Sequence, residues 1–179
     1  MSDWTSTSMP YLAPPGEGAP SDAWGAEASA QGRRGTQRIA QAGEVPAPPP
    51  VAALLGLEPG CPVVARRRVI ELDDVPTELT DTYYPTAIAR GTPLAGTGKI
   101  RGGAVALLAQ LGHVGVRVRE DITARMPDTE ERTELRMTED EPVLQITRLT
   151  LDAQDRPIQA DLITMPAHRQ RLRYEIRIG

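Results

Sequence analysis

The sequence predicts a single α+β domain in which helices lie on an antiparallel sheet built from two similar halves. Three observations lead to this fold class. Residues at the ends of the expected elements recur 80 positions apart. Apolar and polar residues alternate along paired runs, as they do in β-hairpins. Apolar helical stretches precede and interrupt these runs in both halves. The recurring pairs are Gly32 and Gly112, Gly35 and Gly115, Leu55 and Leu135, Pro62 and Pro142, Val63 and Val143, and Arg68 and Arg148.

A shared order of elements at a fixed offset indicates two copies of one supersecondary unit. Each copy is too small to bury its apolar face alone, so the copies should pack around a common core. Such packing leaves a crevice along the seam, where small ligands tend to bind. The alternative is a chance alignment of common residue types.

The chain begins with a segment of different composition. Residues 1–20 are rich in Ser, Thr, Pro and Gly and are predicted to form a flexible arm or linker, which Trp4, Tyr11 and Leu12 could dock on the domain. The domain itself is expected to span residues 21–179.

The first half contains clear helix and strand boundaries. Gly32 ends the first helix. Prolines from Pro46 to Pro50 break the following strand, and Pro50 opens the next helix. The expected elements are a helix from residue 21 or 22 to 31, a strand near 36–45, a helix over 50–55, and a hairpin of strands 62–72 and 77–84.

The second half repeats this order. Gly112 ends an apolar helix, and Asp128 or Thr129 caps the next one. The expected elements are a helix over 103–111, a strand over 115–126, a short helix after 128, a hairpin of strands 142–152 and 156–165, and a final strand over 171–178.

The composition excludes several classes of function. A formal charge of −4 and a pI near 5.3 argue against a surface that binds a nucleic-acid backbone, because such binding requires clustered positive charge. Cys61 is the only cysteine, so an intrachain disulfide and a Cys-based zinc site are excluded. His113 and His168 lack the spacing of a metal site. The chain has neither a secretory leader nor a membrane-spanning run, so we expect a cytoplasmic protein without cofactor or metal.

Four runs of sequence together resemble a known family. They are LGLEPGCPVVARRRVIELDDVPTELTDTYYP, KIRGGAVALLAQLG, GVRVREDITARMPDTEE and DEPVLQITRLTLDAQDRPIQADLITMPAHRQRLRYE. Their order and spacing resemble the UTRA domain, the ligand-sensing module of GntR-class transcription regulators of the HutC branch, and the YYP, GG and ARMP pieces are similar to an actinobacterial subgroup.

The resemblance implies a fold and an assembly. The fold is that of chorismate lyase, a sheet of about six antiparallel strands with flanking helices, and the module is usually a homodimer. Members carry a winged helix-turn-helix head before the sensor. Residues 1–20 are too short to form one, so we expect the head to be lacking here, either in nature or because it was removed.

The start of the second-half helix is the first candidate ligand site. Gly102, Gly103 and Ala104 follow a loop that carries Lys99 and Arg101. Backbone N–H groups at a helix start attract anions. In the UTRA family this helix start receives the phosphate or carboxylate of the effector. The alternative is that the glycines only permit a tight turn.

Arg68 is the second candidate. It lies on a strand with Arg66 and Arg67, so at least one of these side chains faces the core. A buried guanidinium needs an anionic partner. Arg68 matches the arginine that UTRA sensors turn toward their ligand. The alternative is an internal pair with Asp81 or Asp161.

Departures from the family pattern indicate the ligand class. Thr80, Gln159 and Met165 stand where the family has Glu, Glu and Tyr, positions that matter in sensors of phosphorylated amino sugars. We therefore expect a small, largely apolar ligand with one anionic or carbonyl end. The candidate ligand-binding residues are Arg68, Thr80, Tyr83, Lys99, Arg101, Gly102, Gly103, Ala104, Gln159, Asp161 and Met165.

Three functions remain open at this point. The leading hypothesis is a non-catalytic effector-binding domain of a transcription regulator, which controls DNA binding through a dimer and touches DNA only through a separate head. The second is a stand-alone headless sensor that forms mixed dimers with full-length regulators. The third is a chorismate-lyase-like enzyme in which Arg68 holds a substrate carboxylate; it requires a general acid that the sequence does not reveal.

Overall fold

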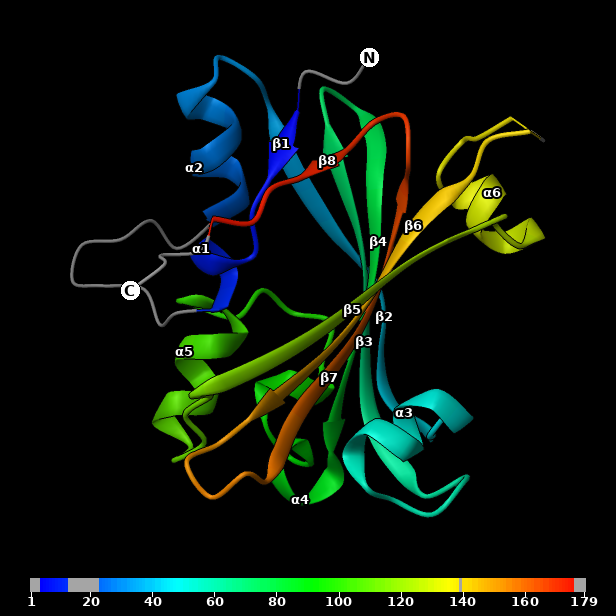
Figure 1. Cartoon of the computed structure of the whole chain (residues 1–179). Coiled ribbons are helices and arrows are strands. Elements are labelled where there is room, and N and C mark those ends of the chain that lie inside the picture. Colours follow the sequence, from blue (N-terminus) through cyan, green and yellow to red (C-terminus); the bar gives the residue numbers. More distant parts are fainter. Residues whose placement is uncertain (1–3, 13–22, 139, 176–179) are drawn as a thin grey trace.

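A six-stranded antiparallel sheet forms the centre of the molecule (Figure 1). The structure is a computed structural model that describes residues 4–12, 23–138 and 140–175. The strand order is β2-β3-β4-β7-β6-β5. The strands are β2 (Gly35–Pro46), β3 (Pro62–Leu72), β4 (Val75–Pro85), β5 (Arg117–Arg125), β6 (Val143–Leu151) and β7 (Pro157–Pro166). The predicted α+β class, with about six antiparallel strands, is confirmed.

The two halves have the same order of elements. Helix α2 (Ala23–Ala30) and helix α5 (Gly103–Gln110) begin and end 80 residues apart, and helix α3 (Pro49–Leu55) begins 80 residues before helix α6 (Thr129–Glu134). The halves meet at β4 and β7, the central strands of the sheet. The predicted repeat is therefore a property of the structure and not a chance alignment.

Each half buries part of the other. Helix α3 lies against β7 and helix α6 against β4, so the second helix of each half covers the central strand of the other. Leu55 and Leu135, which are repeat equivalents, are 5% and 0% exposed. Truncating a leucine buried to this degree costs about 2–5 kcal/mol. The exchanged helices make the two halves one domain.

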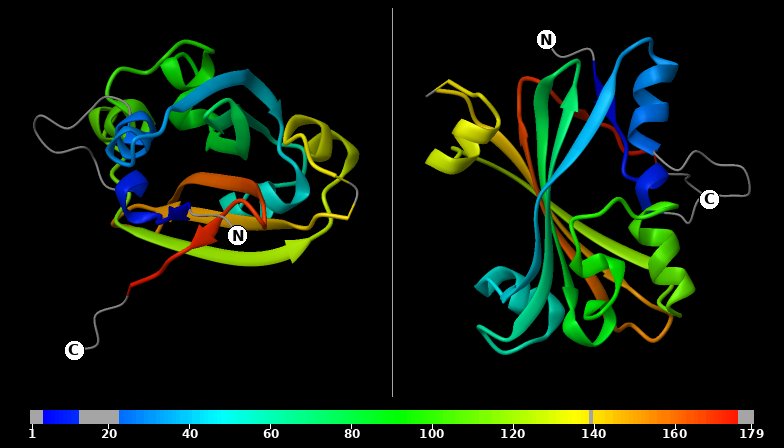
Figure 2. Two further views of the ribbon diagram at one scale, coloured as in Figure 1. Left: turned by 90° about the horizontal axis from the view of Figure 1, so that it is seen from above. Right: turned by 180° about the vertical axis from the view of Figure 1, so that it is seen from behind.

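Helices α2 and α5 lie on the opposite face of the sheet. There Trp24 and Ala28 of α2 pack on the end of β3, and Leu108 of α5 packs beneath Tyr84 together with the short helix α4 (Thr86–Ala89) and the 3₁₀ turn η1 (Pro93–Ala95). Seen from above, the sheet is strongly curled, and its edge strands β2 and β5 lie on opposite sides of the molecule (Figure 2).

The predicted caps have clear chemical causes. Asp128 is the N-cap of α6 and accepts a hydrogen bond from the Glu131 N–H at 2.8 Å, while the Glu131 carboxylate accepts one from the Asp128 N–H at 3.0 Å. This reciprocal pair is a capping box. Gly56, which was not among the predicted helix stops, ends α3 in the left-handed conformation, with φ at +65°. The cap expected at residue 21 or 22 lies outside the described residues.

The last predicted strand requires a correction. Only Arg171–Leu172 form a strand, β8, which pairs in parallel with β1 (Thr5–Ser6) of the arm and not with the large sheet. The guanidinium of Arg169 donates to the backbone carbonyls of Pro76, Leu135 and Arg136, which holds the turn after β7 and leads the chain away from the sheet. Carbonyls of the arm then accept hydrogen bonds from the N–H groups of Arg171 and Arg173. Residues 176–178 lie outside the described residues.

Candidate functional site

A cavity of about 460 Å³ lies between the sheet and the layer formed by α2, α5 and the arm. This volume is typical of sites for small molecules. Its lining residues come from the arm, α2, the start of α5, strands β2, β3, β4, β6 and β7, and the segment after β7 that leads into β8. The lining residues from β3, β4, β6, β7 and the start of α5 include Arg68, Ile70, Glu78, Thr80, Thr82, Tyr84, Gly102, Gly103, Ala104, Val105, Ile146, Arg148, Gln159, Asp161, Ile163 and Met165.

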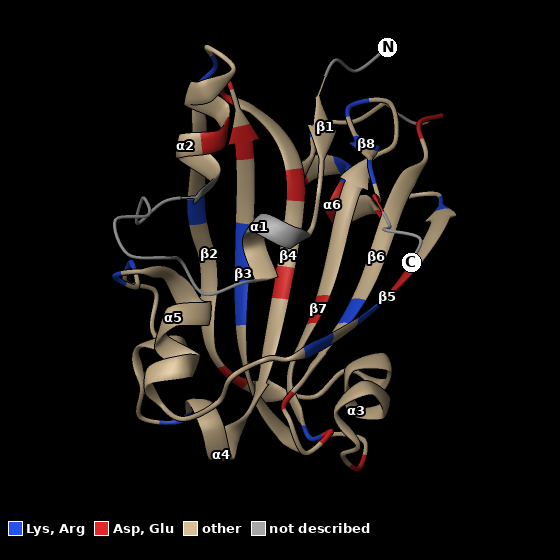
Figure 3. Ribbon diagram, turned by 60° about the vertical axis from the view of Figure 1, so that its left-hand side comes forward, with Lys and Arg blue, Asp and Glu red and all other residues tan. Residues whose placement is uncertain are grey.

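Strand alternation determines which side chains reach this cavity. Successive side chains of a strand point to opposite faces, so every second residue lines the wall. Register then aligns these residues across the sheet, because directly opposite residues share a face. One such row runs Arg66, Thr82, Asp161, Arg148, Glu120, and the next runs Arg68, Thr80, Ile163, Ile146. Charged residues of β3, β4, β6 and β7 accordingly gather near the middle of the sheet (Figure 3).

Arg68 faces the cavity without a protein partner. Its half-buried guanidinium makes no hydrogen bond or ion pair with any residue in the described part of the chain. Its cross-strand neighbours are Thr80 on β4 and Ile39 on β2, and neither carries a charge. The two carboxylates considered as internal partners are engaged elsewhere. Asp81 binds Arg67 at 2.8 and 2.9 Å, and Asp161 accepts hydrogen bonds from Thr82 and Gln159.

The repeat equivalent of Arg68 has the partner that Arg68 lacks. Arg148 lies 80 residues later, between Glu120 on β5 and Asp161 on β7. Its Nε donates to Glu120 Oε1 at 2.6 Å, and both side chains are about 10% exposed. Thus β5 supplies a carboxylate where β2 supplies Ile39. The divergence of the two halves leaves one arginine available to an anion from outside the protein.

Burial and hydrogen bonding set the state of the two acids in the cavity. Burial raises the pKa of the half-buried Glu78 carboxyl above its ordinary value, although the Thr80 hydroxyl and the charges of Arg68 and Arg148 oppose this shift. Asp161 is 1% exposed; it accepts from Thr82 Oγ1 at 2.7 Å and from Gln159 Nε2 at 2.8 and 3.0 Å. Thr82 and Gln159 therefore replace part of the hydration that burial removes from Asp161.

The start of α5 presents backbone donors to the cavity. Gly102 and Gly103 have φ values of +78° and +84°, which side chains rarely adopt, so glycine is needed for the turn. The Gly103 N–H donates to the Ile100 carbonyl, and no side chain caps the helix. Since the first N–H groups of a helix have no partner within it, those of Ala104 and Val105 are available to a ligand. The glycines therefore permit the tight turn and also leave room for an anion site at the start of the helix, so the two interpretations are compatible.

Eight of the predicted ligand residues line the cavity. They are Arg68, Thr80, Gly102, Gly103, Ala104, Gln159, Asp161 and Met165.

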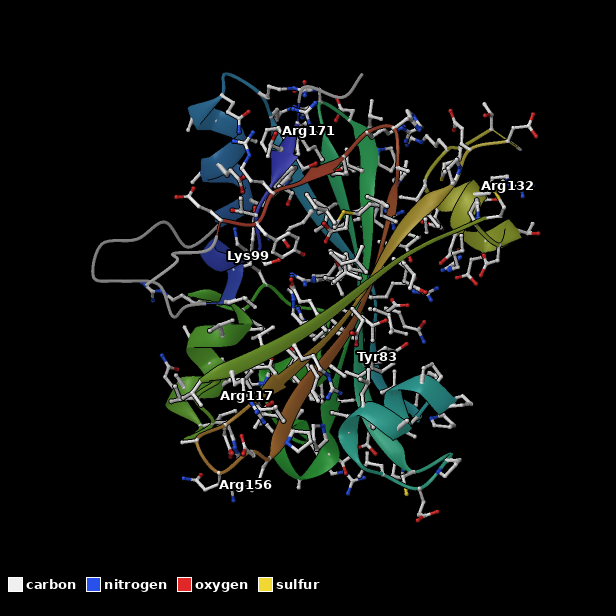
Figure 4. The ribbon with its side chains drawn as sticks, viewed as in Figure 1. Tyr83, Lys99, Arg117, Arg132, Arg156 and Arg171 are labelled. Atoms are coloured by element: carbon white, nitrogen blue, oxygen red, sulfur yellow. The ribbon has the colours of Figure 1, made fainter. Side chains whose placement is uncertain are left out.

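Tyr83, Lys99 and Arg101 are not among the lining residues. Tyr83 is three positions from Thr80 and therefore faces the other side of the sheet, where it packs with α3 (Figure 4). Its neighbour Tyr84 forms the cavity wall instead. Lys99 and Arg101 are exposed on the loop before α5.

Several lining residues were not predicted. Alternation from Thr80 would have found Glu78, Thr82 and Tyr84. The repeat would have found Arg148 from Arg68. Trp4 and the other arm residues carry no local signal, because their contribution depends on where the arm docks.

Two further observations concern metal ligands and membrane-spanning helices. Within residues 4–12, 23–138 and 140–175, no three His, Cys, Asp or Glu side chains gather as metal ligands would. None of the helices in the same residues is long and apolar enough to cross a bilayer.

Comparison with known proteins identifies a family model and a relative of similar sequence. The profile of the UTRA domain family matches residues 30–171. An uncharacterized HTH-type transcriptional regulator of Streptomyces coelicolor is 32% identical over 127 residues, which are 69% of this chain and 47% of that regulator. The chain thus spans about half the length of that relative.

Solved structures share the fold. The effector domain of PhnF from Mycobacterium smegmatis superposes with a TM-score of 0.72 at 24% identity, covering 92% of this chain and 98% of that one. The C-terminal domain of the histidine utilization repressor from Pseudomonas syringae pv. tomato superposes with a TM-score of 0.66 at 21% identity, covering 81% and 100%.

Proposed function

This chain belongs to the UTRA domain family, and on that premise we propose that it is the effector-binding domain of a GntR-class transcription regulator of the HutC branch. In this role it binds a small molecule without converting it. The cavity described above is the proposed effector site. The single observation that carries this assignment is Arg68, a half-buried cation that faces the cavity and makes no hydrogen bond or ion pair with a described residue.

The cavity also supports a ligand class. Its wall combines Arg68 and the free N–H groups of Ala104 and Val105 with apolar side chains. The apolar and aromatic part includes Trp4, Trp24, Ile70, Tyr84, Ile146, Ile163, Met165 and Leu172. A small, largely apolar molecule with one anionic or carbonyl end satisfies both parts. Its anionic end would bind Arg68 bidentately and the start of α5 by its backbone donors.

The proposed signal passes through a dimer. An effector changes DNA binding only by its differential affinity for two dimer geometries. DNA contact is assigned to a separate winged helix-turn-helix head, because a domain with a formal charge of −4 is poorly suited to the phosphate backbone. A cytoplasmic location follows from this role, since a bacterial regulator acts on the chromosome.

Two measurements test this assignment. Native mass spectrometry of the purified protein should detect a co-purifying small molecule. Thermal-shift screening should show that aliphatic and aromatic carboxylates raise the melting temperature of the wild type and not that of Arg68→Met. Arg101→Gln is the matched control, because Arg101 is exposed and does not line the cavity. Stabilisation by phosphosugars alone would contradict the proposed ligand class.

One observation favours a second candidate, a lyase-like enzyme. Glu78 lines the cavity near Arg68, and burial raises the pKa of its carboxyl. In this candidate Glu78 is the general acid, and Arg68 holds the substrate carboxylate. Incubation with chorismate followed by chromatography tests this candidate. Consumption that is lost in Glu78→Gln would favour the enzyme, and chorismate that remains intact would remove it.

A further inference from the structure

The arm, residues 4–12, forms a wall of the cavity. Trp4 is 2% exposed, and its ring packs edge-on against Trp24 of α2 with ring centroids 5.0 Å apart. The Tyr11 hydroxyl donates to the Glu27 carboxylate, also on α2. Five residues of the arm line the cavity, namely Trp4, Ser6, Thr7, Ser8 and Tyr11.

The C-terminal segment holds the arm from its other side. The Arg171 N–H donates to the Trp4 carbonyl at 3.1 Å, and the Arg173 N–H donates to the Ser6 carbonyl at 3.0 Å. These bonds belong to the parallel β1–β8 pair. A strand pair of two residues is weak by itself, so further contacts must hold the arm in place.

A partly buried polar cluster provides such contacts. Ser8 Oγ donates to Glu120 Oε2 at 3.1 Å and accepts from Arg148 Nη2 at 3.2 Å. Tyr174 donates to the same Glu120 oxygen at 2.9 Å. Burial would raise the pKa of Glu120, but the charge of Arg148 and these hydrogen bonds outweigh it and hold that pKa below its ordinary value. We call Ser8, Glu120, Arg148 and Tyr174 the latch.

Arg148 belongs to both the latch and the cavity wall. Arg148 therefore connects the position of the arm to the molecule that occupies the cavity. From this geometry we infer that the arm is a component of the effector site, that the latch closes it over the bound molecule, and that occupancy of the cavity and closure of the arm stabilise each other. This inference rests on the proposed function for the identity of the site, but the latch itself can be tested without any ligand.

The coupling follows from linkage. A molecule that contacts Trp4, Ser8 or Tyr11 in the closed state loses those contacts when the arm opens. Its binding therefore favours the closed state by the factor 1 + [L]/Kd. Reciprocally, a weakened latch lowers the closed fraction on which binding depends.

The first experiment breaks the latch in the chain of 179 residues without a ligand. Ser8→Ala removes the hydroxyl that bonds Glu120 and Arg148. Thr7→Ala is the matched control, because Thr7 also lines the cavity but makes no hydrogen bond within the described residues. Amide hydrogen exchange of Arg171 and Arg173 reports arm opening. Ser8→Ala should accelerate this exchange about tenfold, which corresponds to the loss of one ordinary hydrogen bond.

Acrylamide quenching gives an independent readout. Trp4 and Trp24 are the only tryptophans, and both line the cavity, so an open arm exposes both indoles to the quencher. Ser8→Ala should increase quenching and Thr7→Ala should leave it at the wild-type level. Equal exchange and equal quenching in the two variants would overturn the latch.

The second experiment uses decanoate, which has an apolar chain and one carboxylate. At ten times its dissociation constant, measured by calorimetry, decanoate should slow exchange of Arg171 and Arg173 about tenfold in the wild type. Bound decanoate with unchanged exchange would overturn the coupling. Failure of decanoate to bind the wild type would instead contradict the ligand class proposed above, and the latch would still be decided by the Ser8→Ala measurements.

Discussion

Replacing Arg68 with methionine should stabilise the unliganded protein, whereas the same replacement at Arg148 should destabilise it. The two arginines are repeat equivalents with opposite surroundings. Arg68 is half-buried beside Ile39 and Thr80 and makes no hydrogen bond or ion pair with a described residue, although the Glu78 carboxyl lies in the same cavity wall and feels its charge. Arg148 is 9% exposed and paired with Glu120 at 2.6 Å. The same change therefore removes a solvation cost at one site and a buried ion pair at the other.

The magnitudes follow from these environments. Arg68→Met replaces a partly desolvated, unpaired cation by an apolar side chain, which should increase the free energy of unfolding by about 1 kcal/mol. For a protein of this size, that corresponds to a rise in melting temperature of about 2–4 °C. Arg148→Met leaves Glu120 buried without its cation, which costs about 3–5 kcal/mol and lowers the melting temperature by about 6–20 °C.

Differential scanning calorimetry at neutral pH, on protein from which small molecules have been removed, measures both shifts. The decisive result is the direction in which each substitution shifts the melting temperature. If Arg68→Met lowered the melting temperature as much as Arg148→Met does, Arg68 would have a structural role, and the argument that it awaits an anionic ligand would fail. A stabilised Arg68→Met that also loses carboxylate binding would show that this side chain is retained for binding at a cost in stability.

Three further predictions concern the cavity and the caps. Because the pKa of Glu78 is raised in the folded state, its contribution to stability is fully present below the ordinary pKa of 4.5 and is lost as the pH rises through the raised value. Glu78→Gln should therefore increase the melting temperature at neutral pH, by a difference that vanishes below about pH 4.5; a constant difference across pH would contradict this. Gly103→Ala should cost about 1–2 kcal/mol in chemical denaturation, because φ is +84° there although a Cβ would meet no atom within 4 Å. Gly96→Ala, where φ is −110°, should cost less, and equal losses would mean that φ is not the cause. Asp128→Ala should cost about 1 kcal/mol through loss of the capping box, and an unchanged denaturation midpoint would show that the cap contributes nothing.

Local periodicity explains how much of the fold was predictable. The helices and hairpins follow from apolar spacing, glycine stops and proline breaks, and each of these acts within a few residues of chain. The repeat then orders the elements, because two copies of one unit must bury the same face. The short β8 was the exception: the alternation of residues 171–178 is typical of a strand, but alternation does not specify a partner.

The candidate site shows where this reasoning reaches its limit. Arg68 and the glycines before α5 were predicted from the sequence because their residue types and neighbours point to anion binding, whereas Thr80 was selected from the family resemblance. All of them line the cavity. Tyr83 was selected together with Thr80 although three positions separate them, which places them on opposite faces of β4. The arm residues were not assigned to the site, because a segment without periodicity gives no indication of where it docks.

By itself the sequence determined that two similar halves share one antiparallel sheet and which side chains of each strand lie on the same face. Only the tertiary structure decided that Arg148 meets Glu120 while Arg68 meets Ile39, and that the arm lies over the cavity between them. The reason is that alternation is a property of each strand alone, whereas the partner of a charge depends on the register between strands that lie far apart in the chain.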